Sequence, residues 1–392
     1  MRLSNVLLAL LLLVPISTSA QALVEDAVSV MKARVISIES EETALIPGTD
    51  TPTQYQTIRV EVLDGEEAGK EILVENDYLS LETGDVFYLG HTVNELDNVD
   101  YYTVKEPYRI PALLILLGLF VAITLILGGI QGIRGLLSLI LSLFVIVFVL
   151  LPGVLAGYSP VLIAVGTASF IVLVGAYVTH GVSRMTTTAV LGMVATIMFT
   201  GILAYLSIHW TKLSGFSAEE ATYLHFNSRG KIDLAGLLLG GIIIGLLGVL
   251  YDAAIGQSVA VEELQRAGKT MTRKAIYVRA LRMGREHIGA LVNTLAIAYV
   301  GAALPLLLLF YGTASLDVIE MLNREIFAAE IVRILVGSIG VILVVPITTA
   351  IAVLMLVKDE HVLSDKGQQT SEGGKGENIN WTSRDRHHHN HT

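Results

Sequence analysis

The pattern of apolar and polar positions changes at about residue 110. Before that point, residues 23 to 109 alternate between apolar and polar side chains in short runs, as half-buried β-strands do. After it, long apolar runs fill most of residues 110 to 357. A run of about 20 apolar residues is long enough to cross the ~30 Å hydrocarbon core of a bilayer as a helix. The pattern therefore predicts a small β domain followed by a polytopic α-helical membrane domain.

The first part of the pattern contains five candidate strands, with turn-forming sequences such as Asp64-Gly65 and Thr83-Gly84-Asp85 between them. The predicted strands are residues 27 to 38, 55 to 63, 70 to 74, 85 to 89 and 101 to 104. Five short strands in so few residues favour a small antiparallel β-barrel of the OB or SH3 type.

The second part contains seven candidate membrane-spanning helices, each about 20 residues or longer. They lie near residues 111 to 129, 136 to 157, 160 to 179, 187 to 208, 233 to 251, 287 to 311 and 328 to 357. The segment from 209 to 231 has the composition of a solvated loop and is long enough for a short surface helix or a lid.

The two ends of the chain have other patterns. Residues 1 to 22 combine Arg2, a short apolar run and an Ala20-Gln21-Ala22 site, which predicts a cleaved signal peptide. The alternative is an uncleaved anchor. Residues 358 to 392 are poor in apolar side chains and are predicted to form a disordered cytoplasmic tail. The histidines that begin at His387 lack fixed geometry in such a tail, so incidental composition is favoured over a metal site.

Charge separates the two parts further. The chain has a formal net charge of -10, but residues 23 to 109 alone carry 19 acidic and 6 basic side chains. Such an acidic domain disfavours nucleic acid or an anionic membrane as its partner. A cation or a basic protein would suit the charge, and an acidic solvated surface without any ligand is the simpler alternative. With no cysteine, the chain has no disulfide and no thiolate site.

The distribution of basic residues predicts the orientation in the membrane. The 252 to 286 connector carries Arg266, Lys269, Arg273, Lys274, Arg279, Arg282 and Arg285. The opposite loops offer only Lys212, Arg229, Lys231 and Arg324. Because basic residues accumulate on the cytoplasmic side, we expect the β domain outside the cell and the C-terminus inside, in a multi-pass protein of the cell membrane. Apolar positions between 260 and 281 recur at helical spacing, so the connector is predicted to be an amphipathic helix that lies on the inner leaflet or packs on the bundle.

Polar side chains at membrane depth concentrate between residues 236 and 310. Asp252 directly follows an apolar span, and an ionisable group at that depth is costly enough to suggest function. Pro305 interrupts the next span, where polar groups beside a loosened backbone are how many carriers build a solute site. The residues predicted to line a path are Asp252, Ser258, Asn293, Thr294 and Tyr299. The alternatives are an interfacial carboxylate at Asp252 and ordinary interhelical hydrogen bonds for the others.

Sequence signals for catalysis are missing. The chain contains no G-x-S-x-G, no H-E-x-x-H, no P-loop and no paired aspartates in its apolar segments. We therefore expect no enzyme, no cofactor, no bound metal and no nucleotide-driven transport. Glu330 and Arg333, at i and i+3, are predicted to pair with each other.

Two blocks in this region carry a family resemblance. GLLGVLYDAAIGQSVAVEEL (Gly245 to Leu264) and GREHIGALVNTLAIAYVGAALPLLLLF (Gly284 to Phe310) resemble the signature blocks of the YibE/F-like family of bacterial multi-pass membrane proteins. The matching positions are Gly248, Asp252, Ser258, Glu263, Gly284, Arg285, Gly289, Asn293, Thr294, Ala298, Tyr299, Gly301, Leu304 and Pro305. The chain departs from the pattern at Gly256, Gln257, Glu286 and His287. The resemblance implies a location in the membrane and a fold with an exported N-terminal segment, but no particular activity.

Two classes of function fit these observations. In the first, the protein is a permease or channel-like carrier, with a polar path for an ion or small solute between the fifth and sixth predicted spans. In the second, it is a non-transporting scaffold or sensor whose exported β domain binds a protein partner. The lipid bilayer is a partner in both.

Overall fold

The computed structural model describes residues 29–45, 52–77, 79–94, 99–217, 219–268, 271–312 and 317–357. The predicted signal peptide (1 to 22) and the predicted tail (358 to 392), with its histidines, lie outside these residues. The chain divides into two compact units, one ending at Ile133 and the other beginning at Arg134. Each unit is described by itself.

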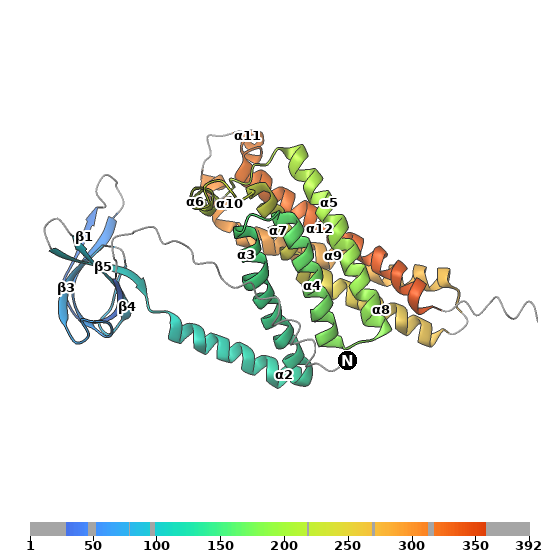
Figure 1. Ribbon diagram of the computed structural model, residues 1–392, viewed down its shortest axis with the longest axis horizontal. Coiled ribbons are helices and arrows are strands. Elements are labelled where there is room, and N and C mark those ends of the chain that lie inside the picture. Colours follow the sequence, from blue (N-terminus) through green and yellow to red (C-terminus); the bar gives the residue numbers. More distant parts are fainter. Residues whose placement is uncertain are drawn as a thin grey trace, which may run out of the picture. The chain divides into compact units, whose positions relative to one another are not determined.

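The N-terminal unit contains a five-stranded antiparallel sheet in the order β3-β2-β1-β4-β5 (Figure 1). The strands are β1 (Ser29–Leu45), β2 (Pro52–Val62), β3 (Glu71–Asn76), β4 (Val86–Asn94) and β5 (Val99–Pro107). All five predicted strands are therefore present, and most are longer than predicted. The central strand β1 pairs with both β2 and β4, and register shifts near Ser37 and Ser40 let so long a strand bend.

The sheet curls around a small apolar core because one face of each strand is apolar. In β2, Ile58, Val60 and Val62 are buried while Arg59 between them is exposed. Phe87 and Leu89 of β4 fill the same core. The result is a five-stranded antiparallel half-barrel. The finer OB or SH3 assignment stays a prediction.

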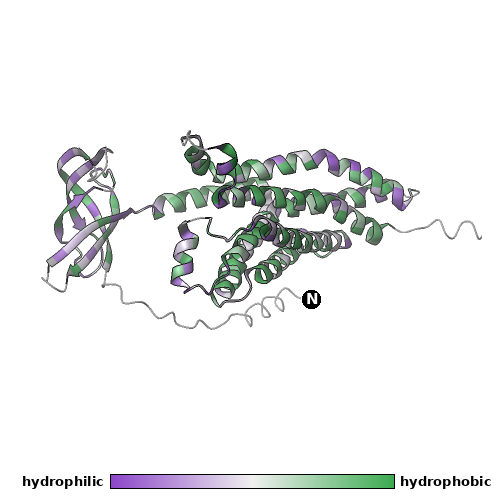
Figure 2. Ribbon diagram, turned by 90° about the horizontal axis from the view of Figure 1, so that it is seen from above, coloured by the Kyte–Doolittle hydropathy of each residue, from purple (hydrophilic) through white to green (hydrophobic). Residues whose placement is uncertain are grey.

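The helical part contains eleven α-helices and one π-helical turn among the described residues, and Figure 2 shows how apolar most of them are. They are α2 (Ile110–Val145), the π-helical turn η1 (Ile146–Leu150), α3 (Leu151–Leu155), α4 (Pro160–His180), α5 (Arg184–Thr211), α6 (Glu219–Asn227), α7 (Leu234–Gly245), α8 (Leu247–Ala267), α9 (Arg273–Ala302), α10 (Leu304–Gly312), α11 (Val318–Leu322) and α12 (Glu325–Leu356). Helix α2 begins in the first unit and ends in the second.

Five helical stretches among the described residues are long and apolar enough to cross a membrane, where seven were predicted. The first two predicted spans form one stretch, Ile110–Leu155, interrupted inside α2 where Gly129 adopts a φ of 52° that most residues avoid. The predicted span at 287 to 311 is not among the five. The first half of that predicted span is the C-terminal part of the basic helix α9. This helix ends at Ala302, shortly before Pro305.

The connector and the loop also differ from the prediction. The connector is not one helix, because α8 ends at Ala267 and α9 begins at Arg273. Asp252 therefore lies inside α8 rather than at the end of a helix. The segment from 209 to 231 does contain a short helix, α6, as its length allowed.

Candidate functional site

Among the described residues, helices α5 and α12 share the most extensive contact of any helix pair. They run antiparallel, since Gly192 of α5 packs against Thr348 of α12 and Thr200 of α5 packs against Gly340 of α12. A Cβ atom at Gly192 would stand 2.8 Å from the Thr348 Cβ and 2.9 Å from its Cα. Glycine at these positions lets the two backbones approach closely, as small residues do between membrane helices.

Buried hydroxyl groups follow this contact from one helix turn to the next. We call them the hydroxyl seam: Thr188, Thr196 and Thr200 of α5, Ser258 of α8, and Ser338, Thr348 and Thr349 of α12. Each of these side chains is at most 8% exposed. Polar groups buried so completely need hydrogen-bond partners. The seam divides into members that have such a partner and members that do not.

Four members of the seam have partners. The Thr188 hydroxyl donates to the Met185 carbonyl and lies 3.2 Å from the Ser258 hydroxyl. The hydroxyls of Thr196 and Thr349 donate to carbonyls four residues earlier in their own helices. Thr349 also lies 2.9 Å from the side-chain oxygen of Gln257, so α8 and α12 are joined at this level.

The other three members have none. The hydroxyls of Thr200, Ser338 and Thr348 are buried without a hydrogen-bond partner among the described residues. They do not bond back to their own helices as Thr196 and Thr349 do. A buried polar group without a partner costs about 1–3 kcal/mol, so three along one interface need an explanation beyond helix packing.

Helix α9 closes the seam at the level of Gln257. A Cβ atom at Gly284 would stand 2.9 Å from the Gln257 side-chain carbon, so glycine is needed where α9 crosses α8. On α12, Pro346 lies inside the helix between the unpartnered Thr348 and Ser338. Proline has no N–H, so the carbonyl of Ile342 loses its helical donor beside the seam.

An ion pair lies on α12 beyond Ser338. Glu330 and Arg333 are 2.9 Å apart and only partly exposed, which confirms their predicted pairing. The Arg333 guanidinium lies 6.0 Å from the centre of the Tyr299 ring. The Tyr299 hydroxyl is buried against Gly245 and has no partner among the described residues.

The structure separates the five predicted path residues. Ser258 is fully buried in the seam, and Tyr299 is half-buried at the other end of it. The side chains of Asp252, Asn293 and Thr294 are exposed, and the Thr294 hydroxyl donates to the Ala290 carbonyl. In the described part of the chain, no hydrogen bond or ion pair joins these five residues to one another.

The family-motif residues have different surroundings. Gly284 packs on Gln257, whereas Gly248, Gly289 and Gly301 have open space where a side chain would stand. Glu263 forms an exposed ion pair with Arg266, 3.1 Å apart. Arg285 is exposed, and Pro305 belongs to α10, directly after the break at Ala303.

Sequence reasoning missed the α5 and α12 members of the seam. A signal was present, because Thr188, Gly192, Thr196 and Thr200 recur every four residues in an otherwise apolar helix. Threonine is common in membrane helices and bonds to its own backbone, so the repeat alone did not indicate a site.

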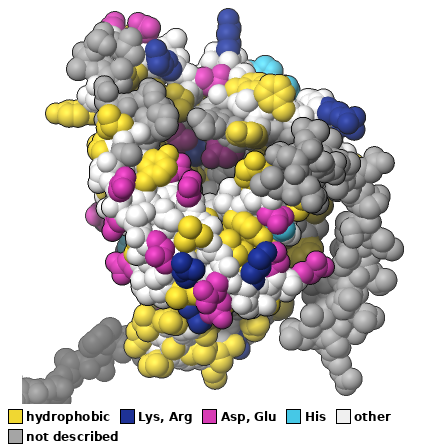
Figure 3. Space-filling view, turned by 90° about the vertical axis from the view of Figure 1, so that its left-hand side faces the viewer, with side chains coloured by type: hydrophobic (Ala, Val, Ile, Leu, Met, Phe, Trp, Pro, Cys, Tyr) yellow, Lys and Arg dark blue, Asp and Glu magenta, His cyan; other side chains and the backbone are white. Residues whose placement is uncertain are grey.

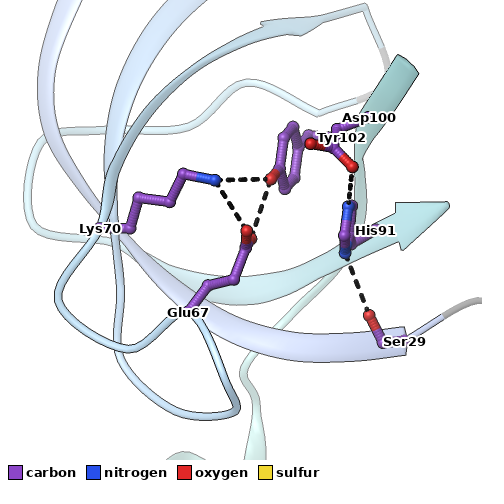
Figure 4. Close-up of polar contacts among 6 residues, drawn as sticks. All are labelled: Ser29, Glu67, Lys70, His91, Asp100 and Tyr102. Atoms are coloured by element: carbon purple, nitrogen blue, oxygen red, sulfur yellow. Dashed lines mark hydrogen bonds and ion pairs between the residues drawn. The ribbon is translucent and has the colours of Figure 1, made fainter. Parts of the chain in front are cut away.

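A second cluster of polar side chains lies in the half-barrel, between the turn that precedes β3 and strand β5 (Figure 4). Glu67 accepts hydrogen bonds from Lys70 at 2.7 Å and from the Tyr102 hydroxyl at 2.9 Å. His91 stacks on the Tyr102 ring, and one of its ring nitrogens lies 2.8 Å from Asp100. We call Glu67, Lys70, His91, Asp100 and Tyr102 the β3–β5 clasp, because it joins the turn that leads into β3 to β5, a strand with which β3 does not pair.

The clasp shifts the titration of its own groups. The hydrogen bond from Lys70 is the largest cause that holds the pKa of Glu67 below its ordinary value. The reciprocal bond from Glu67 raises the pKa of Lys70, and burial is the largest cause that raises the pKa of Tyr102.

The acidic side chains in Figure 3 are spread over the surface rather than gathered in one patch. Among the described residues, no group of three or more His, Asp or Glu side chains is arranged to hold a metal ion.

These features first identify the class of protein. The protein is an α-helical membrane protein with five candidate spans among its described residues, an interior seam of buried hydroxyls and an N-terminal half-barrel. Residues 116–358 match the family described as YibE/F-like protein, so the chain belongs to that family and the resemblance of its two blocks is confirmed. Comparisons with curated proteins and with solved structures gave no match.

Proposed function

We propose that this protein is a carrier of a small ion or polar solute, and that the hydroxyl seam is its path. The observation behind the proposal is the row of buried hydroxyls at Thr200, Ser338 and Thr348 without partners among the described residues. Water or a solute passing along the seam would supply the missing hydrogen bonds. Packing alone gives no reason to bury three unpaired hydroxyls on one interface.

The seam and the Glu330 and Arg333 pair beyond it together reach far enough for a path across the bilayer. From Thr349 to Arg333, α12 advances 16 residues, or about 24 Å at 1.5 Å per residue. That distance is most of the ~30 Å hydrocarbon core. The seam, from the Gln257 level to Ser338, and the Glu330 and Arg333 pair beyond it therefore together extend over most of that thickness.

The close contact at Gly192 and Gly340 favours a carrier over an open channel. Helices α5 and α12 pack closely at both glycines, so a solute could move along the seam only if these helices separated. Pro346 weakens the α12 helix at this level and offers a place for such a movement. Alternating exposure of a central site in this way is common among carriers with interrupted helices.

The five residues predicted to line a path also contribute to this proposed function, but in different roles. Ser258 belongs to one end of the seam, and Tyr299 lies beyond the other end, beside Arg333. Asp252, Asn293 and Thr294, which are exposed on α8 and α9, would act where the solute enters. In the orientation that the basic residues favour, the half-barrel lies outside the cell and the C-terminus lies in the cytoplasm.

A flux assay tests the proposal. The purified full-length protein is reconstituted in liposomes, and monovalent cations, divalent cations and small metabolites are screened for uptake. Thr200→Val and Thr348→Val remove seam hydroxyls at nearly constant volume and should abolish uptake. Thr124→Val is the matched control, because the Thr124 hydroxyl donates to the Phe120 carbonyl of its own helix, α2, and its flux should equal that of the unmodified protein.

Results of two kinds would contradict the proposal. One is the absence of flux for every solute class, and the other is flux that both seam variants leave unchanged. Asp252→Asn and Asn293→Ala test the entry residues separately. A loss with these two variants but not with the seam variants would move the path to the α8 and α9 surface.

The second candidate is a scaffold or sensor without transport. The half-barrel favours it in one respect, because it has its own apolar core and belongs to a separate compact unit. Such a domain could bind a protein partner. Capture of one defined partner by the half-barrel, together with zero flux, would support this function over the carrier. The prediction that the protein is not an enzyme stays a prediction.

A further inference from the structure

Helix α6 has two apolar faces, of which the bundle covers only one. Ala221 and Leu224 pack with Val154 of α3 and Leu234 of α7, which fixes α6 beside those helices in Figure 1. Tyr223 and Phe226 lie on the opposite face and are 72% and 73% exposed. A helix immersed in water would usually carry polar side chains on that face.

The helix that precedes this segment, α5, has an exposed apolar stripe of its own. Met198, Ile202, Leu206 and Trp210 follow one another at four-residue intervals, so they share one outer face of α5. All four are exposed, and Trp210, in the last turn, is 75% exposed. In a membrane-spanning helix this stripe faces lipid, and it ends in a tryptophan.

The loop between α5 and α6 is held firmly. The Glu325 carboxylate, at the start of α12, accepts hydrogen bonds from the backbone N–H groups of Ser214 and Gly215 at 2.9 Å and 2.7 Å. The Ser214 hydroxyl donates to the same carboxylate. This contact holds the loop that follows α5 against the start of α12, and the packing of Ala221 and Leu224 decides which face of α6 is turned outward. Lys212, Arg229 and Lys231 flank the segment and are exposed.

We propose that α6 lies in the headgroup layer of the bilayer, with Tyr223 and Phe226 inserted among the lipids at the depth of Trp210. Three observations favour lipid as the occupant of this face. The segment follows directly on the lipid-facing stripe of α5, the large side chains on the exposed face of α6 are aromatic, and basic residues that suit phosphate groups flank it. Tryptophan and tyrosine concentrate at membrane interfaces because their rings are apolar while their N–H and O–H groups prefer water.

This position gives the segment from 209 to 231 a role that its composition did not suggest. It is an interfacial anchor rather than a solvated loop or a lid. The anchor marks where the membrane surface meets α5. Through Glu325, it also fixes the depth of α12 and therefore of the seam in the bilayer.

The native tryptophans allow a direct test. The chain has two, Trp210 and Trp381, so Trp381→Phe leaves Trp210 as the only one. In liposomes, its emission should shift to the blue relative to a water-exposed tryptophan. Lipids brominated near the glycerol end of their chains should quench it more strongly than lipids brominated near the methyl end. Emission typical of water, with no quenching by either lipid, overturns the proposal.

A second set of variants tests α6 itself. In a background with Trp210→Phe and Trp381→Phe, the variant Tyr223→Trp places the single probe on the exposed face of the helix. We expect the same preference for shallow bromines. Leu73→Trp in the same background is the control, because Leu73 is 55% exposed on β3 of the half-barrel and should not be quenched. A blue-shifted Tyr223→Trp probe that brominated lipids leave unquenched would show that protein covers α6, and the lipid assignment would then be wrong.

Discussion

The contact between α5 and α12 makes a quantitative prediction at Gly192. Replacing Gly192 by alanine places a methyl group 2.8 Å from the Thr348 Cβ and 2.9 Å from its Cα. Since the nearest atoms include backbone, a side-chain rotation cannot relieve the clash. Overpacking of this kind costs about 1–3 kcal/mol. Alanine also favours helix over glycine by about 1 kcal/mol, which offsets part of that cost.

A matched glycine separates the two effects. Gly241 lies in α7, is exposed, and has no atom near the position of an added Cβ. Gly241→Ala should therefore show only the gain in helix propensity, about 1 kcal/mol. The free energy of unfolding of Gly192→Ala should be lower than that of Gly241→Ala by about 1–3 kcal/mol, because propensity contributes to both variants and the clash to only one.

The measurement is the free energy of unfolding of the purified full-length protein by steric trapping in bicelles. Loss of the monodisperse species on heating in detergent gives an independent ranking. If Gly192→Ala is as stable as Gly241→Ala, the α5 and α12 backbones are not in close contact. The closed seam inferred from that contact would then be wrong.

Two further predictions concern the loop at Gly215 and the β3–β5 clasp. Gly215→Ala should destabilise the full-length protein by about 1–3 kcal/mol, because Gly215 has a φ of 89° and lies against the backbone of Leu234. Steric trapping measures the loss, and an unchanged value would refute the loop geometry. Because folding lowers the pKa of Glu67, the ionised Glu67 carboxylate stabilises the folded protein above its ordinary pKa. This stabilisation is lost as the pH falls through the pKa that Glu67 has in the folded protein. The pKa of Lys70 is raised, so its contribution is lost only as pH rises through the folded value, in strong alkali. Thermal unfolding of the half-barrel, followed across pH by tyrosine circular dichroism, should show an acid-side loss that Glu67→Gln removes; an unaltered profile in that variant would contradict the clasp.

Much of the architecture follows from the sequence pattern. The alternation in β2, with Ile58 and Val60 on one side and Arg59 on the other, placed a strand correctly because only one face of this sheet is buried. The hydropathy of α4, α5 and α12 predicted their positions, since long apolar runs have few other stable environments. The pairing of Glu330 with Arg333 was also predictable, because i and i+3 are neighbours on any helix.

Tertiary structure alone decided which face of each membrane helix is interior. Lipid and protein core are both apolar, so the periodicity that reveals the buried face of a soluble helix is weak in α5 and α12. The sequence therefore could not tell that Thr200 and Thr348 face each other's helix while Asp252 and Asn293 are exposed. The break at Gly129 was hidden for a related reason, because glycine is common inside membrane helices and its φ depends on the packing around it.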